Sequence, residues 1–226
     1  MRAINDYMKL AADVAKHNAS FAEDVREEIV ELVNDILDAL TPVLKDKDYA
    51  KSVFSNAVLT RAMPLSYGIF NDFLLGNLQA CFMQLRTMLE ALVKAHYADM
   101  ISDELFTAKM KKFTECLREI RISTSEVLKS LEEYSPEASC LALKIWNKCS
   151  EEWVHPNHFF EKLVEIVIKH ERPPAYSLAL PMIYGEEDRE PLNELKNLIK
   201  DFRKLFKMLI VLHYGCRLTE VKNNNS

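Results

Sequence analysis

The feature that most constrains the fold of this chain is an apolar stretch from Ile69 to about Asp99. Its apolar residues recur at steps of three and four, which is the spacing of one face of an α-helix. They are Phe70, Leu74, Leu78, Cys81, Leu85, Met88, Leu92 and Ala95, with Phe73, Phe82, Leu89 and Val93 on a second face. A helix that is apolar on two sides has to be surrounded by other helices. The stretch therefore predicts a long central helix over about 69–99, buried in a bundle and roughly 45 Å long.

Helical spacing also characterises the segments before and after this stretch. A regular apolar face predicts a last helix over about 190–213, formed by Leu192, Leu195, Ile199, Phe202, Phe206, Leu209 and His213. Serine followed three residues later by glutamate is typical of a helix start, and it occurs at Ser20–Glu23 and Ser123–Glu126. We therefore predict an all-α fold, a multi-helix bundle that forms a single domain over residues 1–220 and is followed by a disordered tail over 221–226.

One segment, Glu171 to Glu187, has no helical period although it is rich in apolar residues. It contains three prolines and one glycine, and a loop of this length is often a lid or a binding segment. Apolar side chains in a loop have to cover something, which leaves three alternatives: the protein's own core, a pocket or a partner.

The composition narrows the class of function. With 29 basic and 34 acidic residues the net charge is −5, which gives no general attraction to nucleic acid. The five cysteines form no CxxC pair, so we expect reduced thiols in the cytoplasm rather than a disulfide framework or a zinc module. The four glycines form neither a GxGxxG nor a GxxxxGK[ST] motif, and we expect no cofactor. Only two glutamines beside abundant Lys and Glu indicate a thermophilic source.

The apolar stretch carries one ordered set of polar residues. Asp72, Gln79, Arg86, Glu90 and Tyr97 follow one another at steps of 7, 7, 4 and 7, so they line one strip of the predicted helix. Arg86 and Glu90 have the spacing of an i,i+4 ion pair. Charged residues in the middle of the apolar stretch argue against a membrane span. The strip could face solvent, tie two helices together through a buried pair, or form a functional site.

A second set of polar residues lies in the sequence Trp153-Val154-His155-Pro156-Asn157-His158. Imidazole titrates near neutral pH and binds metals, so His155 and His158 are candidate site residues. Pro156 marks a junction between two predicted helices, however, and the pattern is not the HExxH helix of zinc hydrolases. We therefore expect no metal here, and His155 could instead cap the helix that begins at Pro156.

Two segments, Leu78 to Asp99 and Trp146 to Leu163, resemble a group of helical prokaryotic proteins related to the HEPN superfamily. The resemblance consists of Leu85, Arg86 and Glu90 on a long helix, followed by an aromatic-Val-His-Pro turn at 153–156. It implies a helical bundle, dimerisation, and the convergence of Arg86, Glu90 and His155 in one polar pocket. HEPN ribonucleases carry an arginine shortly followed by a histidine on one helix, and Arg86 to His96 is a longer spacing than theirs.

We therefore predict a cytoplasmic homodimer, without membrane contact, that acts by interaction and can bind a protein partner. Arg86 is expected to bind an anion, Glu90 to orient it, and His155 to donate or accept a proton. One alternative is a metal-independent endoribonuclease of the toxin or defence type that uses His155 as acid or base and Arg86 to stabilise phosphate charge. Another is a nucleic-acid-binding module whose basic stripe is formed by Lys109, Lys112, Arg118, Lys200, Arg203, Lys204 and Lys207.

Overall fold

The computed structural model describes residues 2–45, 52–100, 105–118, 123–154, 164, 168 and 181–223. The described α-helices are α1 (Arg2–Phe21), α2 (Glu23–Lys45), α3 (Val53–Ala57), α4 (Met63–Leu74), α5 (Leu78–Met100), α6 (Phe106–Leu117), α7 (Thr124–Ser130), α8 (Pro136–Lys148) and α10 (Arg189–Asn223). Two π-helical turns, η2 (Val58–Ala62) and η4 (Cys149–Val154), continue α3 and α8. The described residues contain no strand, so the all-α, multi-helix class is confirmed.

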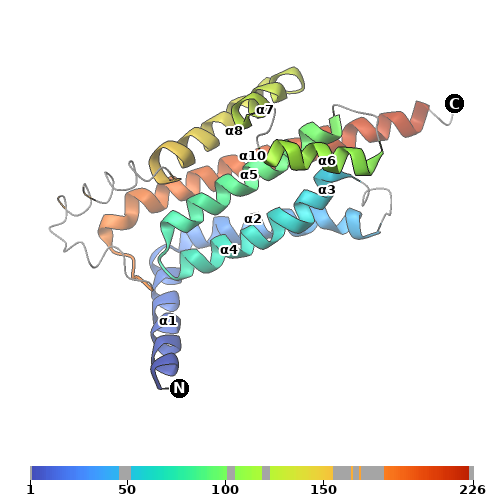
Figure 1. Ribbon diagram of the computed structural model, residues 1–226. Coiled ribbons are helices and arrows are strands. Elements are labelled where there is room, and N and C mark those ends of the chain that lie inside the picture. The colour runs from blue at the N-terminus through green and yellow to red at the C-terminus, as the bar shows by residue number, and fades with distance from the viewer. Residues whose placement is uncertain are drawn as a thin grey trace.

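Helix α5 lies at the centre of the bundle. It packs against α3, α4, α6, α7, α8 and α10. The helices α7 and α8 lie on one side of α5 and α10, and α2 and α4 lie on the other (Figure 1). The second half of α5 is buried on all its sides, as expected of a helix that is apolar all round. The buried residues that show this are Ala91, Leu92, Val93 and Ala95.

The predicted continuous helix over 69–99 is wrong at its beginning. Helix α4 ends at Leu74 and α5 begins at Leu78, so the stretch forms a helical hairpin (Figure 1). Gly76 makes the turn with a φ of 80°, and a Cβ there would lie 2.1 Å from the carbonyl oxygen of Met182. The apolar spacing of three and four continues across the turn, and therefore periodicity could not reveal it.

Other helix boundaries follow the sequence signals to different degrees. The capping box of Ser123 and Glu126 is present at the start of α7. The one predicted at Ser20–Glu23 is absent, because α1 continues through Ser20 and the backbone N–H of Ala22 still donates to Asn18 O at 3.1 Å. Helix α10 extends well beyond residue 213, to Asn223, and the predicted tail over 221–226 stays a prediction.

The end of the apolar loop is fastened to the hairpin by Asn18 of α1. The Asn18 Nδ2 donates to the carbonyls of Leu74 at 3.0 Å and Met182 at 2.9 Å, and its Oδ1 accepts from the Tyr184 N–H at 2.9 Å. Tyr184 is buried, with its ring 5.6 Å from that of Phe73. This part of the loop therefore covers the protein's own core, whereas residues 171–180 lie outside the described residues.

Candidate functional site

Arg86 and Glu90 lie one turn apart on α5 and form the predicted ion pair. The Arg86 Nε donates to Glu90 Oε1 at 3.0 Å. Trp146 of α8 donates its indole Nε1–H to the same oxygen at 2.9 Å. The Arg86 guanidinium also lies over the Trp146 ring, 5.6 Å from its centroid. Three side chains from two helices therefore meet in one cluster, which we call the Arg86 cluster.

The geometry of this cluster leaves the two terminal nitrogens of Arg86 without an acceptor among the described residues. A guanidinium has five N–H donors, and only the one on Nε is used by Glu90. Among the described residues, no acceptor bonds the two terminal nitrogens of Arg86. The Arg86 side chain is 25% exposed and that of Glu90 is 22% exposed, so the cluster reaches solvent. The terminal nitrogens can therefore donate to a planar anion in the bidentate manner typical of arginine.

The segment that leads to His155 lies along the first half of α5. Trp153 is buried, and its ring stacks on Phe82 with centroids 4.1 Å apart. Gln79 Nε2 also donates to the Trp153 carbonyl at 3.5 Å. His155 lies outside the described residues, so its predicted convergence with Arg86 and Glu90 stays a prediction.

The predicted polar strip is interrupted because Asp72 belongs to α4. Asp72 accepts hydrogen bonds from the amides of Asn77, at 3.1 Å, and Gln84. It therefore fastens the hairpin turn and, among the described residues, is not bonded to any member of the Arg86 cluster. Tyr97 lies at the far end of α5, where partial burial raises the pKa of its hydroxyl.

A second polar cluster is buried where α3 begins, and sequence reasoning missed it. Asp99 Oδ2 accepts from the Phe54 N–H at 2.8 Å and from Ser52 Oγ at 3.1 Å, and its Oδ1 accepts from the Val53 N–H at 3.2 Å. His213 Nε2 lies 2.9 Å from Ser52 Oγ. Ser52, Asp99 and His213 thus come from three distant segments. Of these three residues, the sequence pattern placed only His213 on a buried helix face, that of the last predicted helix.

These residue types also occur in nucleophilic triads, but the geometry here differs. The same histidine nitrogen, Nε2, faces both Ser52 Oγ and Asp99 Oδ2, the latter at 3.7 Å. A relay needs the serine and the carboxylate on opposite nitrogens of the ring. All three residues are also buried, so no substrate reaches them. The cluster is therefore a helix cap, in which a carboxylate binds the free N–H groups at the start of α3.

The four residues of the predicted nucleic-acid stripe that lie on α10 pair with carboxylates of α2 and α8. Arg203 pairs with Asp35 at 2.6 Å, Glu28 at 2.9 Å and Glu31 at 3.1 Å. The lysines of the same helix pair in the same way: Lys200 with Glu28, Lys204 with Glu137 and Lys207 with Asp35. Because each positive charge has a nearby negative one, this part of the stripe offers little net attraction to phosphates.

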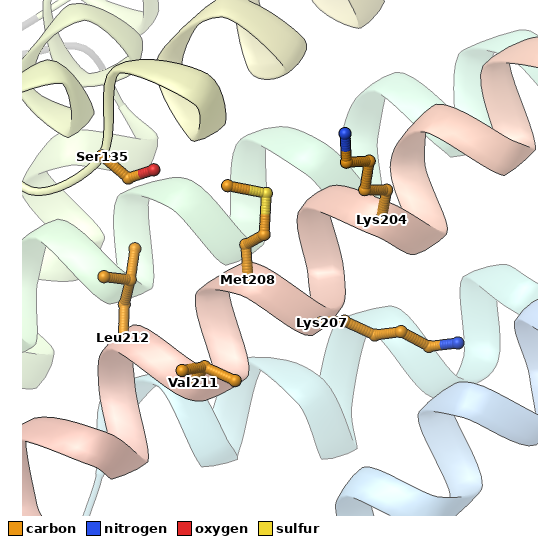
Figure 2. A pocket seen from close by; sticks show the side chains of 6 residues that line it. All are labelled: Ser135, Lys204, Lys207, Met208, Val211 and Leu212. Carbon is orange, nitrogen blue, oxygen red and sulfur yellow. The ribbon is translucent and has the colours of Figure 1, made fainter.

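A surface hollow lies beside α10, away from the Arg86 cluster. Its volume is about 390 Å³, and Ser135, Lys204, Lys207, Met208, Val211 and Leu212 line it. Met208 and Leu212 point toward the corner that carries Ser135, whereas Lys207 points away from it (Figure 2). The lining is mainly apolar, and both lysines are engaged by carboxylates. The lining includes Lys204 and Lys207 of the predicted stripe but neither Arg86 nor Glu90.

The described residues contain no group of three His, Cys, Asp or Glu side chains placed to hold a metal ion. None of the helices in the described ranges combines the length and the apolarity needed to cross a membrane. Comparisons with models of protein families, with curated proteins and with solved structures found no match. The local geometry therefore carries the functional argument.

Proposed function

We propose that this protein acts by binding, and that Arg86 is the residue with which it holds an anionic group of a partner. The supporting observation is that the contacts of the Arg86 cluster use the Nε and one face of the guanidinium. Glu90 accepts from the Nε of the arginine and Trp146 flanks its plane, while among the described residues no acceptor bonds the terminal nitrogens and the side chain is 25% exposed. An arginine held in place before binding loses less side-chain entropy when it binds.

The anion that fits best is a carboxylate of a partner protein, either an acidic side chain or a C-terminus. A carboxylate matches the two terminal nitrogens of a guanidinium in one plane. A nucleic acid would need several cations in a row, whereas the four stripe residues on α10 are already paired with acidic ones. The net charge of −5 also disfavours a polyphosphate chain more than a single carboxylate.

Binding suits this cluster better than catalysis does. Cleavage of RNA requires a group that transfers a proton beside the phosphate. Of the two residues in the cluster beside Arg86, Trp146 is a donor only, and Oε1 of Glu90 already accepts from two donors. The endoribonuclease alternative therefore depends on His155.

The proposal is tested by following the indole N–H signal of Trp146 by NMR while a tetraglutamate peptide is added. The signal should shift saturably, because a carboxylate on Arg86 changes the charge beside the ring. Arg86→Gln should abolish the shift, and Arg86→Lys should weaken it since lysine lacks the planar fork. Lys144→Gln, which removes an exposed cation on the same helix as Trp146, should leave it unchanged. A shift of equal size in the Arg86→Gln variant would refute the proposal.

A nuclease assay separates binding from the endoribonuclease alternative. Purified wild type, Arg86→Ala and His155→Ala should show the same background cleavage of single-stranded RNA. Cleavage by the wild type that disappears in both variants would replace the binding proposal with an enzymatic function.

A further inference from the structure

The first half of α1 extends away from the bundle (Figure 1). Its second half is anchored, because Val14 and Asn18 are buried against the rest of the chain. The first half, residues 4–10, is exposed throughout. Four large apolar residues of that half are exposed by 50–64%, namely Ile4, Tyr7, Met8 and Leu10. A group of apolar side chains this large on a projecting helix marks a surface that is covered in the functional state.

The spacing of these residues is that of a helix-to-helix seam. Ile4, Tyr7, Ala11, Val14 and Asn18 follow at steps of three, four, three and four, as the a and d positions of a heptad do. Met8 and Leu10 flank this line on its two sides and widen the apolar face. The seam is continuous with the part that already packs inside the bundle, where Val14 is buried. The matching occupant is therefore another helix with the same spacing.

The charges of α1 decide between the possible occupants. The side of the helix opposite the seam carries Arg2, Asp6, Lys9, Asp13 and Lys16, two acidic and three basic residues with a net charge of +1. Helices that lie on anionic membranes carry an excess of Lys and Arg on this side. A helix with a net charge of only +1 is weakly attracted to an anionic surface and hardly repels its own copy.

We infer that the exposed face of α1 is a dimer seam, and that its occupant is α1 of a second copy of this chain in antiparallel orientation. An antiparallel pair obeys a twofold axis, so each Ile4–Leu10 face packs on the identical face of the other copy. The exposed residues 4–10 extend only about 10 Å along the helix. A parallel arrangement would bring the two bundles to the same end of this short pair, whereas the antiparallel one separates them.

The exposed area sets the strength of the dimer. A residue of this size has an accessible area of roughly 200 Å², so the four residues at their observed exposure leave roughly 450 Å² per copy. Two such faces bury about 900 Å², which is below the ~1,200 Å² of stable interfaces. The dimer should therefore dissociate on dilution, with a Kd in the micromolar range.

Sedimentation equilibrium of the full chain over a range of concentrations tests this inference. The wild type should pass from monomer to dimer, and Tyr7→Glu should raise the Kd at least 100-fold. Val211→Glu is the matched control, since Val211 is 69% exposed on α10 and its change should leave the Kd unaltered. Circular dichroism should show that both variants keep the helical fold, because both positions are exposed.

Three results would overturn the inference. One is a wild type that stays monomeric at concentrations near 1 mM, and another is a Tyr7→Glu variant that dimerises as the wild type does. The third is a monomeric wild type that binds vesicles of phosphatidylcholine and phosphatidylglycerol through α1, with Tyr7→Glu abolishing that binding. In that case the face is a membrane contact.

Discussion

Replacing Asp99 with alanine should destabilise the protein more than any surface change, because it removes the acceptor of the first two backbone N–H groups of α3, while the N-cap bond from the Ser55 N–H to Ser52 Oγ remains. The carboxylate accepts from two buried backbone N–H groups, those of Val53 and Phe54, and from Ser52 Oγ. Ser52 can still bond His213, but the two backbone donors lose their acceptor in a buried place. A buried donor left without a partner costs about 1–3 kcal/mol. The expected loss in the free energy of unfolding is therefore about 4 kcal/mol.

Urea denaturation followed by circular dichroism measures this loss through the shift of the midpoint at constant slope. Asp201→Ala is the matched control, since Asp201 forms a surface ion pair with Lys144 at 2.7 Å. Surface pairs contribute about 0–1 kcal/mol, so the control should lie close to the wild type. A loss below 1 kcal/mol for Asp99→Ala, equal to the control, would refute the capping role.

Acid should destabilise the protein through His96, whose ring lies in the core near Asp99 and His213. Burial lowers the pKa of His96 to about 4, so the neutral ring contributes fully to stability above its ordinary pKa of 6.5. As the pH falls from 6.5 toward 4, the free energy of unfolding should drop by up to about 3 kcal/mol. In the His96→Phe variant the free energy of unfolding should depend less on pH over this range. Gly76→Ala should lower the melting temperature by at least 5 °C, because the positive φ and the Met182 carbonyl both oppose a Cβ, and an unchanged melting temperature would contradict this. Trp146→Phe should lower the free energy of unfolding, measured by urea denaturation, by about 1–2 kcal/mol, since the hydrogen bond to the Glu90 carboxylate is lost. An unchanged free energy of unfolding would show that this bond does not contribute to stability.

The sequence predicted those features that depend on residues close together in the chain. The i,i+4 spacing of Arg86 and Glu90 was sufficient to predict their ion pair, and Ser123 with Glu126 was sufficient to predict a helix start. The apolar residues of α5 and α10 indicated burial correctly because helical periodicity is a local property. The break at Gly76 was missed because the apolar period survives a turn of suitable length.

Contacts between distant segments could not be predicted. Trp146 reaches Glu90 only because α8 packs on α5, and no pattern in the sequence connects the two positions. Asp99 and His213 meet Ser52 for the same reason, through the packing of three helices. The basic residues of α10 form a stripe in the sequence, but their acidic partners lie on α2 and α8. Pairing between helices therefore changes the functional meaning of that stripe.

The exposed face of α1 shows how a sequence pattern is interpreted differently once the fold is known. The apolar spacing of Ile4, Tyr7 and Val14 alone indicates an ordinary buried helix face. In the structure only Val14 of these three is buried, because the helix leaves the bundle before it reaches its N-terminus. The unburied part then becomes a candidate interface.

The most direct test of the central claim is the affinity of the tetraglutamate peptide for wild type and for Arg86→Gln, measured through the indole signal of Trp146. The arrangement of Arg86, Glu90 and Trp146 predicts saturable binding by the wild type and at least a tenfold loss of affinity in the variant. Such a loss corresponds to about 1.4 kcal/mol, as expected for one charge-assisted contact. Equal affinities in the two proteins would contradict the assignment of Arg86 as the anion-binding residue.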